Sequence, residues 1–115
     1  MRLVIYRDFD EIVANQKDKV VTVDSTSLVN LASADDNLGF LLGVLYIDEG
    51  SAYEFDPRTK AECFFCIQGT GTVTEMVTGE VGDLHPGALF VIKSSSSYKI
   101  VADEEVVLVR VEGDE

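Results

Sequence analysis

The stretch "AECFFCIQGTGTVTE" places one glutamate and two cysteines within five positions, Glu62 to Cys66. Carboxylates and thiolates are groups that bind metals, and paired thiols also carry out redox chemistry. A zinc ribbon needs a second C-x-x-C pair, and a thioredoxin-like motif needs a helix beside a βαβ unit; the sequence offers neither. Residues i and i+3 of a β-strand point to opposite faces, so we expect Cys63 and Cys66 to be reduced, with at least one buried.

The only histidine, His85, lies in "DLHPGAL" directly before Pro86 and Gly87, a typical turn sequence. One histidine cannot form a histidine-rich metal site, and a histidine in a turn is usually solvated. In these two segments Glu62 is therefore the residue best suited to a chemical role.

Short β-rich runs separated by turn residues must position these side chains. They are "KVVTV", "STSLVNLA", "GFLLGVLYI", "SAYEF", "ECFFCI", "GTVTEMV", "ALFVI", "SYKIV" and "EVVLVRV". Segments such as "ADDN", "DEG" and "TGEVGD" are typical of turns. Helical periodicity is confined to residues 8–16, where Ile12 and Val13 are candidates to anchor one turn. The pattern predicts an antiparallel sandwich or barrel.

Length and charge narrow the classes of function. The 115 residues fit one domain, 1–115, and 46% hydrophobic content predicts a folded chain. The net charge of −12 disfavours nucleic acid and anionic lipid as partners. No apolar run approaches the roughly 20 residues of a membrane span, and the first residues lack a signal-peptide core. We therefore expect a cytoplasmic protein with no membrane partner.

Two segments resemble the sequence motifs of cupin barrels. "GSAYEFDPRTKAECFFCIQG" matches the spacing of G-x5-H-x-H-x3/4-E-x6-G, with these residues in its slots: Gly50, Asp56, Arg58, Glu62 and Gly69. "GDLHPGALF" is similar to P-x-G-x2-H, with Phe90 in the histidine slot. The resemblance implies an all-β cupin fold, a jelly-roll barrel, with residues 62–75 as its central hairpin and Gly69 and Gly71 at the turn.

The resemblance narrows to the ectoine synthase family over residues 26–112. "ECFFCIQGTG" is similar to that family's E-A-V-Y-C-I-E-G-x-G, "PGALF" to P-G-T-x-Y, and "DDNLGFLLGVLYIDEG" to a D-D-G-x-G-F segment. It implies a small dimeric barrel that binds a metal, usually iron, and cyclises an N-acetylated diamino acid with loss of water.

The implied metal ligands are a glutamate, a tyrosine and a histidine, of which only the glutamate has a counterpart, Glu62. Phe90 falls in the tyrosine slot and Tyr98 in the histidine slot. A catalytic transition metal normally keeps three protein ligands. We therefore expect no tightly held metal and no cofactor. The alternative is iron held by Glu62, Tyr98 and Asp56.

On the substrate side, Thr26 and Asn30 fall where the resembled family has tryptophan and arginine, and Arg110 and Glu112 where it has cysteine and phenylalanine. Strand alternation directs these last two toward the face of Glu62. They line either a ligand cavity or the solvated rim of a terminal strand. The candidate catalytic residues are Glu62 and Tyr98. The candidate ligand-binding residues are Arg58, Arg110, Glu112, Tyr53 and Phe90.

Three functions remain open. The first is a divergent member of the resembled family that binds a small polar metabolite in its barrel without a tightly held metal. The second is an active lyase that forms a ring with loss of water. The third is a non-catalytic structural or partner-binding barrel filled by Tyr53, Phe55, Phe64 and Phe90. We expect a homodimer, because "GFLLGVLYI" is apolar on both faces.

Overall fold

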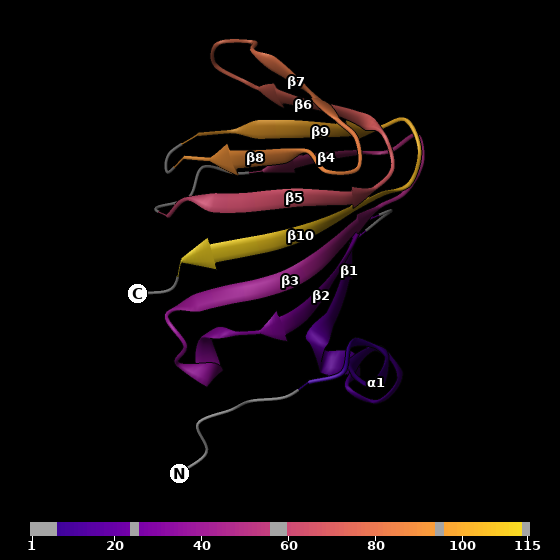
Figure 1. Ribbon diagram of the computed structural model, residues 1–115, viewed down its shortest axis with the longest axis vertical. Coiled ribbons are helices and arrows are strands. Elements are labelled where there is room, and N and C mark those ends of the chain that lie inside the picture. The colour runs from indigo at the N-terminus through magenta and orange to yellow at the C-terminus, as the bar shows by residue number, and fades with distance from the viewer. Residues whose placement is uncertain (1–6, 24–25, 56–59, 94–95, 114–115) are drawn as a thin grey trace.

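The structure is a computed structural model that describes residues 7–23, 26–55, 60–93 and 96–113. Within these ranges the chain forms ten β-strands, one α-helix and two short 3-10 helices (Figure 1). All strand pairs are antiparallel, and the strands form two sheets. The predicted antiparallel all-β architecture is confirmed.

The two sheets face each other with the hydrophobic core between them. The larger sheet has the order β1 (Val20–Val23), β2 (Thr26–Ala32), β3 (Phe40–Ile47), β10 (Val106–Gly113), β5 (Glu62–Gln68) and β8 (Leu89–Ile92). The smaller sheet has the order β4 (Ala52–Phe55), β9 (Tyr98–Ala102), β6 (Gly71–Glu75) and β7 (Val81–Leu84). Core residues come from both sheets and include Leu45, Phe64, Ile100 and Leu108.

Period-two alternation along β5 decides which of its residues face the core. Glu62, Phe64 and Cys66 are buried, whereas Phe65 is exposed and Cys63 is half-buried. Both thiols are free, and burial raises the pKa of the Cys66 thiol. The prediction of two unpaired cysteines on opposite faces is confirmed.

The expected hairpin at residues 62–75 is wrong, because β5 and β6 belong to different sheets and do not pair. Gly69 and Gly71 instead let the chain pass very close to the end of β9 and to the turn that follows it. A Cβ atom on Gly69 would lie 2.0 Å from the carbonyl oxygen of Glu105, and one on Gly71 would lie 2.1 Å from that of Val101. The two glycines therefore make a corner at which the chain crosses from one sheet to the other.

One further strand and one helical side chain differ from expectation. "TGEVGD" was predicted to be a turn, but its valine begins β7, the edge strand of the smaller sheet.

The helix, α1 (Phe9–Asn15), is capped by the Asp8 side chain, which accepts a hydrogen bond from the Glu11 N–H. Ile12 is buried as predicted, whereas Val13 is 42% exposed. Among the described residues there is no helix with the length and apolar character needed to span a membrane.

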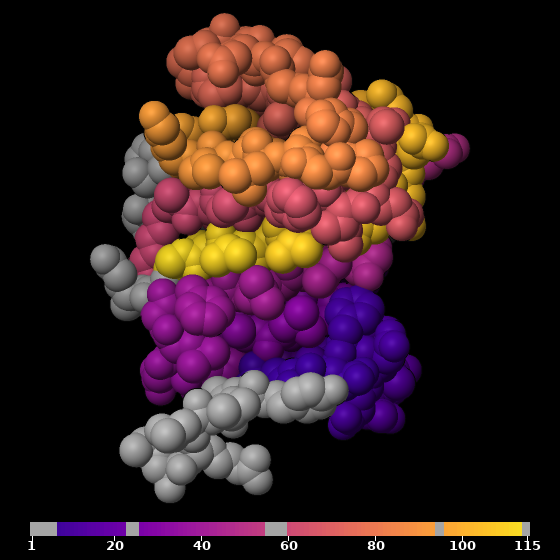
Figure 2. All heavy atoms as spheres, viewed as in Figure 1, coloured from indigo at the N-terminus to yellow at the C-terminus, as the bar shows by residue number. Residues whose placement is uncertain are grey.

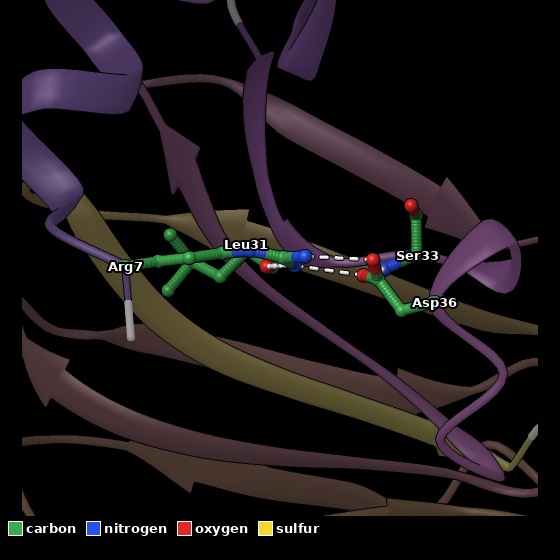
Figure 3. Close-up of polar contacts among 4 residues, drawn as sticks. All are labelled: Arg7, Leu31, Ser33 and Asp36. Carbon is green, nitrogen blue, oxygen red and sulfur yellow. Dashed lines mark hydrogen bonds and ion pairs between the residues drawn. The ribbon is translucent and has the colours of Figure 1, made fainter. Parts of the chain in front are cut away.

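An ion pair ties the segment before α1 to the end of β2 (Figure 3). The Arg7 guanidinium donates two hydrogen bonds, of 2.6 and 2.7 Å, to the two carboxylate oxygens of Asp36 and a third to the Leu31 carbonyl oxygen. Asp36 ends the short 3-10 helix η2 (Ala34–Asp36) and also accepts from the Ser33 N–H. Arg7, and to a lesser degree this N–H group, hold the pKa of Asp36 well below its usual range.

Candidate functional site

Three charged side chains project from β5 and β10 into the space between the sheets. In the register of these strands Arg110 lies opposite Phe64, and Glu112 lies opposite Glu62. Residues paired across an antiparallel ladder share a face, and Phe64 is fully buried. Glu62, Arg110 and Glu112, which we call the inner charge cluster, therefore point inward.

The inner charge cluster is held by short charge-assisted hydrogen bonds. Arg110 Nε donates to Glu62 Oε2 at 2.6 Å, and Arg110 Nη2 donates to Glu112 Oε2. The side chains of Glu62, Arg110 and Glu112 are 1%, 11% and 12% exposed. The view that Arg110 and Glu112 only solvate the rim of a terminal strand is therefore wrong.

A second feature is a pocket between the β6–β7 hairpin and β8, which we call the β6–β8 pocket. Figure 2 shows the molecule hollowed between these elements, and the pocket has a volume of about 490 Å³. Its apolar lining includes Val73, Phe90 and Val91. Its polar lining consists of Glu75, Thr78, Glu80, Lys93, Ser96 and Tyr98. The pocket thus offers groups of both charges beside an aromatic surface.

Local hydrogen bonds and burial set the charge states in this pocket. The Glu75 carboxylate accepts from the Val77 N–H at 3.0 Å and from the N–H and hydroxyl of Thr78 at 2.7 and 2.6 Å. These bonds, with the Thr78 hydroxyl contributing most, lower the pKa of Glu75. Burial, and then the charges of Glu75 and Glu80, raise the pKa of Tyr98. At neutral pH the pocket therefore presents a fixed carboxylate and a neutral phenol.

An aromatic pair connects the pocket with the inner charge cluster. The rings of Phe64 and Phe90 stack with centroids 4.9 Å apart and planes inclined by 7°. Arg110, Phe64 and Phe90 follow one another across β10, β5 and β8. Among the described residues, the pocket lining includes Phe90 and Tyr98 but neither Glu62 nor Arg110. The two candidate catalytic residues, Glu62 and Tyr98, thus come from opposite sheets.

The other residues singled out in the sequence have mixed positions. Tyr53 packs against the hydrophobic core. Asn30 is half-buried in the same cross-strand row as Arg110, with Gly43 between them. His85 is exposed in a turn, as predicted. The predictions for Asp56 and Arg58, and for the side chain of Phe55, lie outside the part of the chain that the structure describes.

Sequence reasoning missed Glu75, Glu80 and Lys93, which supply the charged lining of the β6–β8 pocket. A turn over residues 78–83, as the sequence suggests, hides the β6–β7 hairpin that carries Glu75 and Glu80. A usable signal was the short connection from Glu75 to Val81, whose Gly79 has a φ of +76°. A loop of this length with a glycine in the left-handed region is typical of hairpins.

The residues do not fit a tightly held iron at the slots that the family resemblance assigns. Glu62 is engaged by Arg110, and Phe90 has no lone pair and stacks on Phe64. Tyr98 would have to lose its proton to become a strong ligand, and its raised pKa opposes that loss. No group of three or more His, Cys, Asp or Glu suited to a metal occurs among the described residues. The alternative set of Glu62, Tyr98 and Asp56 includes a residue outside the part of the chain that the structure describes.

The two facing antiparallel sheets have the arrangement of a cupin fold, as comparison with solved cupins shows. A cupin-2 domain from Rhodospirillum rubrum superposes with a TM-score of 0.71 over 84% of this chain and 68% of the other, at 17% identity. The sequence model of the ectoine synthase family matches residues 4–112, and the chain therefore belongs to this family.

Individual relatives agree with this assignment. The L-ectoine synthase of Mycolicibacterium vanbaalenii is 31% identical over 100 residues, which cover 87% of this chain and 75% of the relative. The crystal structure of ectoine synthase from P. lautus superposes with a TM-score of 0.87 at 21% identity, over 96% of this chain and 78% of the other. The predicted cupin fold and family resemblance are confirmed.

Proposed function

We propose that this member of the ectoine synthase family binds a small polar metabolite at the β6–β8 pocket and does so without a tightly held transition metal. The observation that carries the proposal is the state of Glu62, the one family metal ligand that the chain retains. Its carboxylate is buried and bonded to Arg110 at 2.6 Å, while Phe90 and Tyr98 occupy the other two slots.

The lining of the pocket indicates the chemistry of the ligand. The Glu75 carboxylate can accept hydrogen bonds from an ammonium or hydroxyl group, and Lys93 can donate to a carboxylate or carbonyl oxygen. The neutral Tyr98 hydroxyl can do either. Phe90 offers an apolar surface for a short carbon skeleton. A compact ligand with donors and acceptors at opposite ends matches this arrangement.

The second candidate is a lyase of the ectoine synthase type, and the comparisons favour it over the first. The cited relatives carry the name of this enzyme, and the family match covers residues 4–112. If iron were held by the alternative ligands Glu62, Tyr98 and Asp56, it would supply Lewis-acid chemistry. The β6–β8 pocket would contribute the groups that bind and orient the substrate. A non-catalytic dimeric barrel is the third candidate.

Ligand binding and catalysis can be separated by one set of measurements. The protein is incubated with an N-acetylated diamino acid, with and without Fe²⁺, and assayed by thermal shift and by mass spectrometry of the products. The first candidate predicts a rise in melting temperature that is independent of iron and is lost in Glu75→Gln and Tyr98→Phe. Glu54→Gln, on exposed β4, is the matched control. Iron-dependent loss of water from the ligand would establish the lyase instead.

We also propose that the chain forms a homodimer through the outer face of β5 and β8. The stretch 39–47, which was expected to leave apolar surface, largely forms the central strand β3. Larger exposed fractions occur on β5 and β8, where Phe65, Ile67, Leu89 and Val91 are 42–61% exposed, compared with 40% for Phe40 on β3. Two copies that each carry a charge of −12 repel, so an uncharged patch is the favoured contact.

Light scattering tests the homodimer. Leu89→Glu is expected to convert a dimer to a monomer, whereas Val77→Glu, at the exposed tip of the β6–β7 hairpin, is expected to leave the mass unchanged. A mass near 12.6 kDa for the unmodified protein at micromolar concentration would contradict the proposal.

A further inference from the structure

Two carboxylates lie side by side on one wall of the β6–β8 pocket. Glu75 ends β6, and its N–H donates to the Glu80 carbonyl oxygen at 2.8 Å across the β6–β7 hairpin. In the register of β6 with β9, Glu75 also lies opposite Tyr98. Tyr98, Glu75 and Glu80 therefore form one cross-strand row, and all three line the pocket.

The charges of this row are not compensated inside the described part of the chain. Glu75 and Glu80 carry like charges at neighbouring cross-strand positions, which repel each other. The donors that hold the Glu75 carboxylate, from Val77 and Thr78, are neutral. No lysine or arginine among the described residues forms an ion pair with Glu75 or Glu80. Both charges act on the pocket, because both raise the pKa of Tyr98. This wall therefore suits a cationic group of a ligand.

The β8 side of the pocket supplies one cation and an apolar surface. Lys93 directly follows β8 and lines the pocket together with Phe90 and Val91. It forms no ion pair with any residue that the structure describes. The pocket thus has two carboxylates on the side of the β6–β7 hairpin and one ammonium group on the side of β8. A complementary ligand carries two cationic groups and one carboxylate.

We propose that the β6–β8 pocket selects a basic amino acid, the class of small molecule that carries two cationic nitrogens and one carboxylate. The inference rests on the proposed function, which places a polar metabolite in this pocket, and it specifies the class of that metabolite. Glu75, whose carboxylate is fixed by three hydrogen bonds, binds the α-ammonium group. Glu80 binds the side-chain cation, Lys93 binds the carboxylate, and the methylene groups contact Phe90.

The inference predicts that the second cation of the ligand increases its affinity. Isothermal titration calorimetry compares L-ornithine with Nδ-acetyl-L-ornithine, in which acylation removes that charge, and with L-norleucine, in which a methyl group of similar size replaces the ammonium group. All three offer an ammonium group to Glu75 and a carboxylate to Lys93, so all three are expected to bind. L-ornithine should bind about three- to fivefold more tightly than the other two, the gain typical of one exposed ion pair.

Two variants of the same hairpin test whether Glu80 reads the second cation. Glu80→Gln should bind the three compounds with similar affinities, while its affinity for L-norleucine stays close to that of the unmodified protein. Asp83→Asn is the matched control, because Asp83 is an exposed carboxylate of β7 that does not line the pocket. It should keep the preference for L-ornithine. Both replaced side chains are exposed, so both variants are expected to fold.

The inference is overturned if L-norleucine or Nδ-acetyl-L-ornithine binds as tightly as L-ornithine, or if the preference persists in Glu80→Gln. It is also overturned if Asp83→Asn loses the preference to the same extent, because the net charge of the protein would then explain it. In each of these cases, binding of the acetylated compound that is lost in Glu75→Gln still supports the proposed function. Failure of all three compounds to bind would overturn the proposed function as well.

Discussion

Two arginine–carboxylate contacts in this protein have the same length but different surroundings. Arg7 bonds Asp36 and Arg110 bonds Glu62, both with a closest approach of 2.6 Å. In the first pair the side chains are 33% and 15% exposed, and in the second they are 11% and 1% exposed. The first connects two segments at the surface, whereas the second lies between the sheets. The two pairs therefore differ in burial and not in contact distance, and burial decides how much each contributes to the free energy of unfolding.

The physical reason lies in what each partner meets when the other is removed. When its partner is removed, an exposed carboxylate is hydrated again. A surface ion pair therefore contributes only about 0–1 kcal/mol to the free energy of unfolding. A buried carboxylate that loses its cation has no water to replace it, and breaking such a pair typically costs about 3–5 kcal/mol. In the inner charge cluster one guanidinium bonds two carboxylates, so its removal affects both of them.

The largest effect is expected from Arg110→Leu measured in metal-free buffer. We predict a loss of about 3–5 kcal/mol in the free energy of unfolding, because Glu62 and Glu112 both lose their hydrogen bond to a buried guanidinium. Urea denaturation followed by circular dichroism measures this value.

A control variant tests whether the loss comes from unpaired charge. Replacing Glu62, Arg110 and Glu112 together by leucine removes every charge of the inner charge cluster, and should recover most of the stability. If the triple variant is as unstable as Arg110→Leu, loss of packing and not of charge balance would explain the result.

The next effect concerns iron. Restoring the implied family ligands with Phe90→Tyr and Tyr98→His should raise the affinity for Fe²⁺ only modestly while Arg110 still engages Glu62. Adding Arg110→Leu should raise it by a further factor of about ten or more. Titration under anaerobic conditions measures both values. Equal affinities with and without Arg110 would show that the guanidinium does not compete with the metal.

A smaller effect is expected from Arg7→Leu. The Arg7–Asp36 pair should contribute less than about 1 kcal/mol to the free energy of unfolding. This contribution should be smaller still in 1 M NaCl, because salt screens exposed charges. Parallel urea denaturation at low and high salt is the measurement. A loss comparable to that of Arg110→Leu would remove the distinction between the two pairs.

The smallest effect is on how the free energy of unfolding changes at acidic pH. Arg7 lowers the folded-state pKa of Asp36 below its unfolded value of about 3.9. The pair therefore adds stability above that pH and loses it as the pH falls further. Asp36→Asn should destabilise the protein slightly at pH 7 and flatten the decline in stability below pH 4. An unchanged acid profile would show that Asp36 does not titrate as the ion pair requires.

Local sequence patterns predicted the parts of the structure that depend on strand period. Alternation placed Cys63 and Cys66 on opposite faces and Arg110 and Glu112 on the side of Glu62. The family resemblance was needed to choose a cupin barrel over other sandwiches. It also singled out Phe90 and Tyr98, which both line the β6–β8 pocket.

Features that depend on distant contacts were not predicted. Gly69 and Gly71 look like hairpin residues, but their role follows from the approach of Glu105 and Val101, which are 36 and 30 residues further along the sequence. The Arg7–Asp36 pair likewise joins segments 29 residues apart. No local propensity specifies such partners, because they are set by how the two sheets pack.

The central claim is that an internal guanidinium, and not a metal, balances the charge at Glu62. Elemental analysis of the protein purified from iron-rich medium without chelators tests it most directly. We expect iron far below one equivalent per chain and no change in melting temperature after dialysis against a chelator. Stoichiometric iron in the unmodified protein, lost on chelation together with stability, would contradict the account and favour the lyase.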